Sequence, residues 1–350
     1  MKTEDFDKNF LVGTPDGNGL CYMNITEKPF VTYGLMPSDE KGYHRMNPKV
    51  AKKCNDGVAF LNYHTAGGRV RFATDSDTIS IKAESVFMSK MPHMAFTGSI
   101  GFDLYEKLEG EYIYRGSFIP PVDIEDGYTS SINVGEGGMR DYTLNFPLYG
   151  GIKKLEIGLK AGSKLGAGEK YRDMLPVVYY GSSITQGGCA SRPGNAYQTI
   201  VTRKLDIDHI NLGFSGSAKA EKAMCDYLAN LEMSVFVCDY DHNAPTLEHL
   251  RKTLPTLIET FRKKQPETPI IMMSRPQCRP NEDEIARRDT VKGVYESQLA
   301  KGDKNIFFID GSRITLFFGG DSATVDGSHP NDLGFMCMAK SVWEVLEKII

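Results

Sequence analysis

Three residues in the second half of the chain have side chains that could perform nucleophilic catalysis. Ser183 follows an apolar run and the turn Gly181-Ser182, while Asp326 and His329 stand three residues apart near the other end of the chain. A serine hydroxyl attacks a carbonyl carbon only when a neighbouring base takes its proton. An imidazole is such a base, with an ordinary pKa of about 6.5, and a carboxylate on its other ring nitrogen fixes its tautomer. The sequence therefore predicts a catalytic triad in which Ser183 attacks, His329 transfers the proton and Asp326 orients His329.

The segments that must position this triad alternate between short apolar runs and helical patterns. Apolar residues at helical spacing predict helices over residues 247–263 and 284–299. Strand–helix alternation is typical of a parallel sheet that helices cover on both faces, and ligands bind beyond the carboxyl ends of such strands. The turn that carries Ser183 directly follows the first predicted strand. The strands are predicted over residues 177–180, 209–212, 235–239, 270–274 and 306–309.

The first half of the chain has a different period. Apolar and polar residues alternate over 78–82 and 154–159, and clusters of Gly, Pro and Asp interrupt the pattern. A period of two predicts an antiparallel β-sandwich in which each sheet buries one face. The small, glycine-rich residues of 160–170 are typical of a linker. We therefore expect an N-terminal β-sandwich domain over residues 1–165 and an α/β domain over residues 171–350.

The composition argues against several classes of protein. Apolar residues make up 41% of the 350 and charged residues 25%, and the net charge of −4 gives no reason to expect nucleic acid as a partner. The apolar runs are too short to span a membrane, and residues 1–7 lack the apolar core of a signal peptide. Seven cysteines without C-x-x-C spacing predict neither a disulfide framework nor a zinc site. We expect a cytoplasmic protein, although a secreted or periplasmic one whose leader had been removed would have the same sequence.

Four short blocks in the second half stand in an order that one hydrolase family uses around its active site. They read GSSIT at 181–185, NLGFSG at 211–216, DYDHN at 239–243 and DGSH at 326–329. With these blocks the second half resembles the SGNH, or GDSL-type, hydrolase family, and Ser183 stands at the nucleophile position. The chain departs from the common pattern at Ser182, where an aspartate is usual, and in the third block, which is not G-x-N-D.

The first half adds to the resemblance. It contains GFDLY at 101–105, similar to the G-x-D-L-Y motif of a variant SGNH group in which a β domain precedes the hydrolase domain. The resemblance implies a flavodoxin-like α/β hydrolase domain after the sandwich. It also implies an oxyanion hole made of the backbone N–H groups of Ser183 and Gly216 and the side-chain amide of Asn243. Such donors accelerate a reaction because they face charge that develops only in the transition state.

The resemblance implies a serine esterase that forms an acyl-enzyme on Ser183 without a metal or an organic cofactor. Short acyl esters, acetyl esters above all, are the expected substrates. A carbohydrate is the expected alcohol, because sandwich domains attached to such hydrolases often contact sugars, which is an argument from analogy alone. Two alternatives stay open: a lysophospholipase or thioesterase of the same family, and a non-catalytic sugar-binding protein. The partner is then a small-molecule or oligosaccharide ester, and the oligomeric state is left open.

Several of these residues also have simpler explanations. Serines such as Ser182 and Ser183 are favoured N-caps of helices, and Asn243 is suited to a turn. Asp239 and Asp241 resemble two ligands of a metal site, but no third ligand is evident.

Residues close to the blocks receive no catalytic role. We interpret Cys189 as a small buried residue and His242 as a structural or rim histidine. Arg192 and Arg275 either line the pocket or lie on the surface. The aspartate and the tyrosine of the G-x-D-L-Y motif are expected to be structural.

Overall fold

The computed structural model describes residues 14–318 and 320–350. Residues 1–7, which lack the pattern of a signal peptide, lie outside the described residues. The described chain forms two compact units, and each is assembled from several segments. The sandwich unit consists of residues 14–44, Tyr63–Tyr171 and Arg192–Gly194, and the α/β unit consists of Arg45–Asn62, Arg172–Ser191 and Asn195–Ile350. The domain limits of 1–165 and 171–350 remain predictions.

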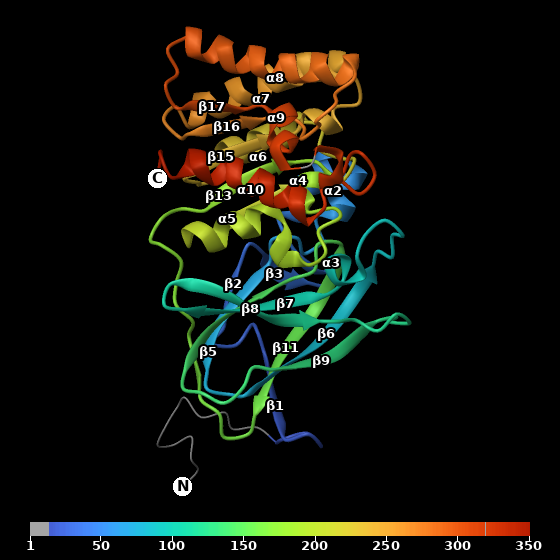
Figure 1. Ribbon diagram of the computed structural model, residues 1–350, viewed down its shortest axis with the longest axis vertical. Helices are drawn as coiled ribbons and strands as arrows, with labels where there is room; N and C mark the ends of the chain where they lie inside the picture. Colours follow the sequence, from blue (N-terminus) through green and yellow to red (C-terminus); the bar gives the residue numbers. More distant parts are fainter. Residues whose placement is uncertain (1–13, 319) are drawn as a thin grey trace. The chain divides into compact units, whose positions relative to one another are not determined.

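Antiparallel sheets form the sandwich unit (Figure 1), as the period of two predicts. In β6 (Thr78–Met88), buried and exposed residues alternate along most of the strand, as they must when one face covers a core. Between the sheets lie fully buried side chains such as Phe72, Ile81 and Leu144. The first sheet has the order β1 (Leu20–Asn24), β11 (Gly150–Lys160), β6 and β9 (Gly127–Asn133). The second has the order β12 (Leu165–Gly166), β5 (Arg69–Thr74), β10 (Arg140–Asn145), β7 (Phe102–Leu108) and β8 (Glu111–Phe118), with β2 (Val31–Tyr33) paired to β5 and a separate hairpin of β3 (Met36–Asp39) and β4 (Gly42–His44).

A parallel sheet forms the centre of the α/β unit. Its strand order is β14-β13-β15-β16-β17, the flavodoxin-like order that the resemblance implies. Every residue of β13 is buried, because helices cover both faces of the sheet. The predicted strands are confirmed to within one residue at each end. The strands are β13 (Val177–Gly181), β14 (His209–Gly213), β15 (Val235–Asp239), β16 (Ile270–Met273) and β17 (Ile306–Ile309).

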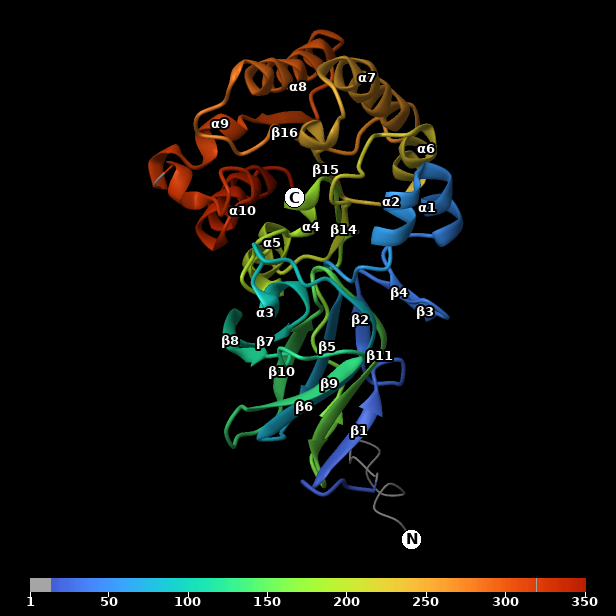
Figure 2. The same ribbon diagram turned by 90° about the vertical axis from the view of Figure 1, so that its right-hand side faces the viewer.

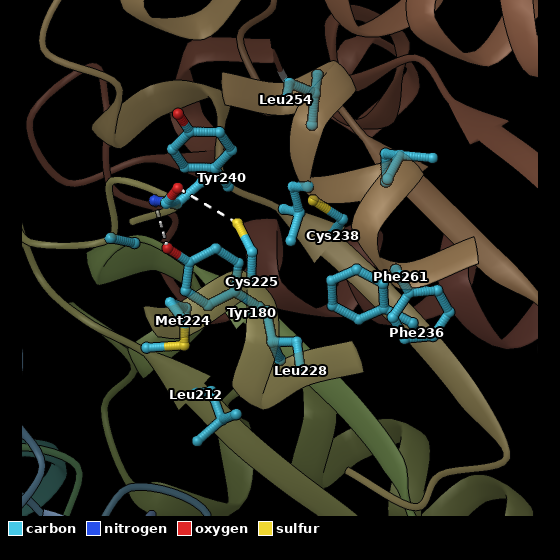
Figure 3. Close-up of a cluster of buried hydrophobic side chains, with 14 of the residues drawn as sticks. Tyr180, Leu212, Met224, Cys225, Leu228, Phe236, Cys238, Tyr240, Leu254 and Phe261 are labelled. Atoms are coloured by element: carbon cyan, nitrogen blue, oxygen red, sulfur yellow. Dashed lines mark hydrogen bonds between the residues drawn. The ribbon is translucent and has the colours of Figure 1, made fainter. Parts of the chain in front are cut away.

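Helices pack on the two faces of this sheet (Figure 2). On one face, Tyr180 and Phe236 of the sheet contact the apolar sides of α6, α7 and α8, as Figure 3 shows for α6 and α7. On the other face, the ring of Tyr179 packs edge-on against Tyr197 of α5, which stacks on Phe335 of α10. The helices are α5 (Tyr197–Leu205), α6 (Lys222–Asn230), α7 (Leu247–Lys264), α8 (Glu282–Ala300), α9 (Gly311–Ile314) and α10 (Asp332–Leu346). None of the described helices is long and apolar enough to cross a membrane.

Helix boundaries follow local capping. Helix α7 ends one residue beyond its predicted limit. Helix α8 begins two residues before its predicted start, because Asn281 and Glu284 form a capping box that satisfies the first N–H groups of the helix. The described helices of the first half are short: α1 (Pro48–Cys54), α2 (Asp56–Leu61) and α3 (Phe96–Ser99). Ala51 of α1 and Val58 of α2 lie in the core of the α/β unit.

Arg45, three residues before α1, connects the segment of α1 and α2 to the end of β14. The side chain is buried, and its guanidinium donates hydrogen bonds to the carbonyl oxygens of Gly213 at 2.6 Å, Leu61 at 2.5 Å and Asn211 at 3.2 Å. The same guanidinium lies 4.6 Å from the centre of the Phe214 ring. Charge-assisted hydrogen bonds to buried carbonyls are strong, so Arg45 fixes the turn that follows β14.

We expect Arg45→Met to destabilise the α/β unit by about 2–3 kcal/mol, because buried carbonyl oxygens lose their donor. The measurement is urea unfolding followed by the fluorescence of Trp343, the only tryptophan of the sequence, which lies in α10. The control is Arg313→Met, whose side chain is 83% exposed, and we expect a change below about 1 kcal/mol there. Equal changes in unfolding free energy for the two substitutions would contradict the conclusion that Arg45 fixes the turn after β14.

Candidate active site

The turn after β13 presents Ser183 at the first position of α4 (Ser183–Gln186). Ser182 is the N-cap of this helix, and its hydroxyl accepts a hydrogen bond from the N–H of Ile184 at 3.1 Å. The simpler explanation therefore holds for Ser182. It does not account for Ser183, whose Oγ lies 2.9 Å from Nε2 of His329.

Neighbouring strand ends fix α4 in place. Thr185 donates its hydroxyl to Asp239 at 3.0 Å, and the Thr185 carbonyl accepts from the side chains of Asn211 at 2.8 Å and Gln198 at 2.6 Å. A Cβ on Gly181 would lie 2.1 Å from the carbonyl oxygen of Asp239. Glycine is required there because the turn passes so close to β15.

The segment before α10 holds the other two triad candidates. Nδ1 of His329 lies 2.8 Å from one carboxylate oxygen of Asp326. The other oxygen accepts the backbone N–H groups of His329 at 2.8 Å and Ser328 at 3.0 Å. A backbone hydrogen bond from Val325 to the His329 carbonyl at 2.9 Å closes the turn. The structure thus joins Ser183, His329 and Asp326 in one hydrogen-bonded series.

The environment of Asp326 keeps its carboxylate ionised. Partial burial acts to raise its pKa, but the hydrogen bonds from the backbone and ring of His329 and from Ser328 outweigh burial and lower the pKa to about 2. An ionised carboxylate only accepts hydrogen bonds, so Nδ1 of His329 carries the proton that lies between them. In the neutral imidazole, Nε2 is then the acceptor that faces the Ser183 hydroxyl.

Gly216 and Asn243, the two other expected oxyanion donors, line one cavity of about 410 Å³. Gly216 has a φ of +65°, which strains other residues, and a Cβ there would meet nothing within 4 Å. Asn243 ends the 3-10 turn η3 (Asp241–Asn243), and its amide donates to the Phe214 carbonyl at 2.7 Å. This bond orients the amide and leaves its second N–H for another acceptor.

The same cavity is strongly polar. The three arginines in its wall are paired: Arg275 with Glu284 at 2.7 Å, Arg287 with Asp283 at 2.6 Å and Arg288 with Asp289 at 2.8 Å. Among the described residues, three buried polar atoms of the wall have no hydrogen-bond partner: Oδ1 of Asp241, Nε of Arg275 and Oε1 of Gln277. Of the two arginines left open by the sequence, Arg275 lines the cavity and Arg192 binds Asp103 within the sandwich unit.

Two neighbours of the triad are unsuited to catalysis. Burial, and then the charges of Arg275 and His329, lower the pKa of His242 to about 3, so its ring is neutral and a weak base. Burial, and then the negative charge of Asp326, raise the pKa of the Cys189 thiol to about 11. A protonated, buried thiol is a poor nucleophile, in agreement with the structural interpretation of Cys189.

The metal-site interpretation of Asp239 and Asp241 finds no support in the geometry. Asp239 accepts the Thr185 hydroxyl, whereas Asp241 accepts the backbone N–H of Arg275 at 3.2 Å. No group of three or more His, Cys, Asp or Glu side chains in the described part of the chain is arranged to hold a metal ion.

Sequence reasoning missed one contact close to the triad. Asn331 caps the first turn of α10, whereas Asp332, the first residue of the helix, makes a different contact. The Asp332 carboxylate accepts the N–H of Ser191 at 2.9 Å and its hydroxyl at 2.5 Å. No sequence pattern identifies a pair that lies 141 residues apart along the chain.

Comparisons with known proteins identify the family of the chain. The model of the GDSL-like lipase/acylhydrolase family matches residues 174–347, and that of the N-terminus of SGNH-hydrolase-type esterases, named GxDLY, matches residues 20–165. The solved structure of a candidate GDSL-like lipase from Bacteroides ovatus is 30% identical, with a TM-score of 0.84 over 94% of this chain and 98% of that chain. The chain therefore belongs to the GDSL-like lipase/acylhydrolase family. It is an SGNH-type esterase with a G-x-D-L-Y sandwich at its N-terminal side.

More distant structures share the fold. The salicylyl-acyltransferase SsfX3 from a tetracycline biosynthetic pathway is 18% identical, with a TM-score of 0.76 over 95% of this chain and 98% of that chain. An active-site mutant of a family two carbohydrate esterase from Clostridium thermocellum is 14% identical, with a TM-score of 0.62 over 91% and 98%. That esterase has also been solved in complex with cellohexaose. No curated protein matches the chain.

The carboxylate of Asp326 should stabilise the fold in a pH-dependent way. Its pKa of about 2 lies below the ordinary 3.8, so its contribution is complete above about pH 4 and is lost as the pH falls toward 2. Because the side chain is 38% exposed, we expect solvent to reduce this contribution to roughly 1 kcal/mol. The difference in unfolding free energy between the wild type and Asp326→Asn should therefore be larger at pH 5 than at pH 3. A difference independent of pH would contradict the low pKa.

Proposed function

We propose that the protein hydrolyses short acyl esters, acetyl esters of carbohydrates above all, with Ser183, His329 and Asp326 as its catalytic triad. The hydrogen-bonded series from Ser183 Oγ through both ring nitrogens of His329 to Asp326 carries this proposal. It contains a nucleophile, a base in the correct tautomer and a carboxylate that stays ionised. The intact series argues against the alternative of a non-catalytic sugar-binding protein.

The reaction proceeds through an acyl-enzyme. Ser183 Oγ attacks the ester carbonyl carbon while Nε2 of His329 takes the hydroxyl proton, and the bond to the alcohol oxygen breaks as His329 returns that proton to it. Water then attacks the acyl-enzyme, gives a proton to His329, and releases the free acid as the proton returns to Ser183. Asp326 holds the ring and balances its positive charge in both steps.

Three donors are proposed to stabilise the oxyanion that forms in each step. They are the backbone N–H groups of Ser183 and Gly216 and the side-chain amide of Asn243. The hydrogen bond from Asn243 to Phe214 fixes the amide before the substrate arrives. Donors fixed in advance cost no reorganisation when charge develops, which is why they lower the barrier.

The chemistry of the cavity supports a polar substrate. The arginines of its wall form ion pairs. Its buried atoms without a hydrogen-bond partner, among the described residues, are two acceptors, Oδ1 of Asp241 and Oε1 of Gln277, and one donor, Nε of Arg275. Sugar hydroxyls donate and accept hydrogen bonds without bringing a net charge, so they complement such a wall. A lysophospholipase or thioesterase would need an apolar channel for its acyl chain, and the charged side chains of this wall are unfavourable for one. The cellohexaose complex of the esterase with a similar fold is consistent with a carbohydrate.

The proposed location is the cytoplasm. All seven cysteines lie in the part of the chain that the structure describes, and that part contains no disulfide bond. Secreted proteins of this kind commonly carry disulfides, whereas cytoplasmic thiols stay reduced.

The first test compares p-nitrophenyl acetate with the butyrate and octanoate esters. We expect acetate to be the best substrate and Ser183→Ala to lose at least about a thousandfold in kcat, because the remaining site lacks a nucleophile. Cys189→Ala is the matched control and should keep wild-type activity. Acetate release from acetylated oligosaccharides tests the alcohol. Turnover that survives Ser183→Ala would overturn the role of Ser183 as the nucleophile. A preference for octanoate, with no acetate release from any acetylated sugar, would overturn the proposed substrate.

The second test concerns the oxyanion donor. Asn243→Ala should lower kcat by about 100- to 1000-fold with a small change in KM, because the lost interaction is made in the transition state. Asn230→Ala, the same change at an exposed position of α6, is the control and should have no effect. A wild-type kcat in Asn243→Ala would show that Asn243 stabilises the turn and is not an oxyanion donor.

A further inference from the structure

The G-x-D-L-Y motif of the sandwich unit holds a tripeptide, residues 192–194, that comes from near the beginning of the second half of the chain. Asp103 is fully buried, and its carboxylate accepts hydrogen bonds from the guanidinium of Arg192 at 3.1 Å and from the N–H of Gly194 at 2.7 Å. The hydroxyl of Tyr105 also binds the guanidinium of Arg192. The ring of Tyr114 lies 4.0 Å from the same guanidinium. Arg192 is thus held from several sides within the sandwich unit.

The backbone of the tripeptide is as closely fitted as the arginine. A Cβ on Gly194 would lie 2.6 Å from the Asp103 carboxylate and 2.6 Å from the Tyr105 ring. Asn145 donates its amide to the other oxygen of Asp103 at 2.7 Å, so the buried carboxylate has partners on both oxygens. Burying a charge is costly unless it is fully paired, so this clamp fixes the position of residues 192–194 rather than merely filling space.

The residue before the tripeptide belongs to the α/β unit and binds the segment that carries the catalytic base. Ser191 donates its N–H and its hydroxyl to Asp332, at 2.9 and 2.5 Å. Asp332 is the first residue of α10 and stands three residues after His329. The clamp is therefore connected to His329 by the peptide bond between Ser191 and Arg192 and by one bidentate contact.

We propose that Asp103 and Tyr105 are positioning residues for His329. This inference rests on the proposed function, because it assumes that His329 is the base of Ser183. The clamp fixes Arg192, the adjoining Ser191 fixes Asp332, and Asp332 fixes the end of the turn that presents the imidazole. A displacement of about 1 Å between a base and its nucleophile is enough to cost up to about a hundredfold in rate. The sequence favoured a purely structural role for the motif, and this proposal extends it to the geometry of the triad.

Tyr105→Phe tests the proposal because it removes the hydroxyl that binds Arg192 and keeps the ring. We expect kcat for p-nitrophenyl acetate to fall about 5- to 20-fold while KM changes less than twofold, since only the alignment of the triad is affected. Arg192→Lys, which replaces the planar guanidinium by a point charge, should have a similar effect. The control is Tyr22→Phe, which removes a hydroxyl bonded to Ser80 elsewhere in the sandwich unit and should leave kcat unchanged.

An NMR measurement separates this proposal from the proposed function. The proton on Nδ1 of His329, held by Asp326, should give a downfield signal in the wild type and in Tyr22→Phe, and a broadened or shifted one in Tyr105→Phe and Arg192→Lys. This signal reports the geometry of His329 whether or not an ester is turned over. An unchanged signal and kcat in both clamp variants would overturn the proposal. So would an equal loss in Tyr22→Phe. If the wild type hydrolyses no ester but the signal is lost in the two clamp variants, the positioning role of Asp103 and Tyr105 is supported, and only the proposed esterase function is contradicted.

Discussion

The hydrogen bonds of Thr185 hold Ser183, the proposed nucleophile, in place, and the rest of the candidate site depends on them. Ser183 stands on a helix of four residues, which is far too short to be stable alone. Its shape is imposed by Asn211, Gln198 and Asp239, whose side chains come from different elements of the α/β unit. The position of the serine hydroxyl is therefore determined by several elements of the α/β unit together. This is the reason that a parallel sheet can present a reactive group at its carboxyl edge.

The electrostatics of the candidate site favour one of several possible nucleophiles. The carboxylate of Asp326 stays ionised because backbone and ring hydrogen bonds outweigh its partial burial. Burial, and then that same negative charge, raise the pKa of Cys189 and so suppress the thiolate, while the charge supports a positive charge on His329. His242 stays neutral because burial, and then the positive charge of Arg275, lower its pKa. Burial and the fixed charge of Asp326 thus disfavour the thiol of Cys189, and the same charge supports the proposed role of Ser183 and His329.

Much of the fold could be predicted from the sequence, because long periodic segments dominate it. The apolar runs before Ser183 and at 235–239 are buried throughout and form central strands of the sheet, and the run at 306–309 forms its edge strand. The order of the motif blocks implied the site, and the structure brings Ser183, His329 and Asp326 into one series. Contacts between segments far apart in the sequence could not be predicted. Arg45 binds carbonyls more than 160 residues later in the chain, and Ser191 binds Asp332, with no periodic pattern to mark either. Helices α1 and α2 were missed because each buries only one or two side chains.

The interleaving of the two units along the chain has a consequence for the way such proteins can evolve. The chain passes from one unit to the other at several points, and residues 45–62 of the α/β unit are encoded within the stretch that otherwise builds the sandwich. Ala51 and Val58 from that stretch share a core with Leu228 and Met224. A gene fragment that began after the sandwich would therefore encode an α/β unit with part of its core exposed. Recombination is expected to exchange the two units as a pair, so the sandwich and the hydrolase should share one history of inheritance.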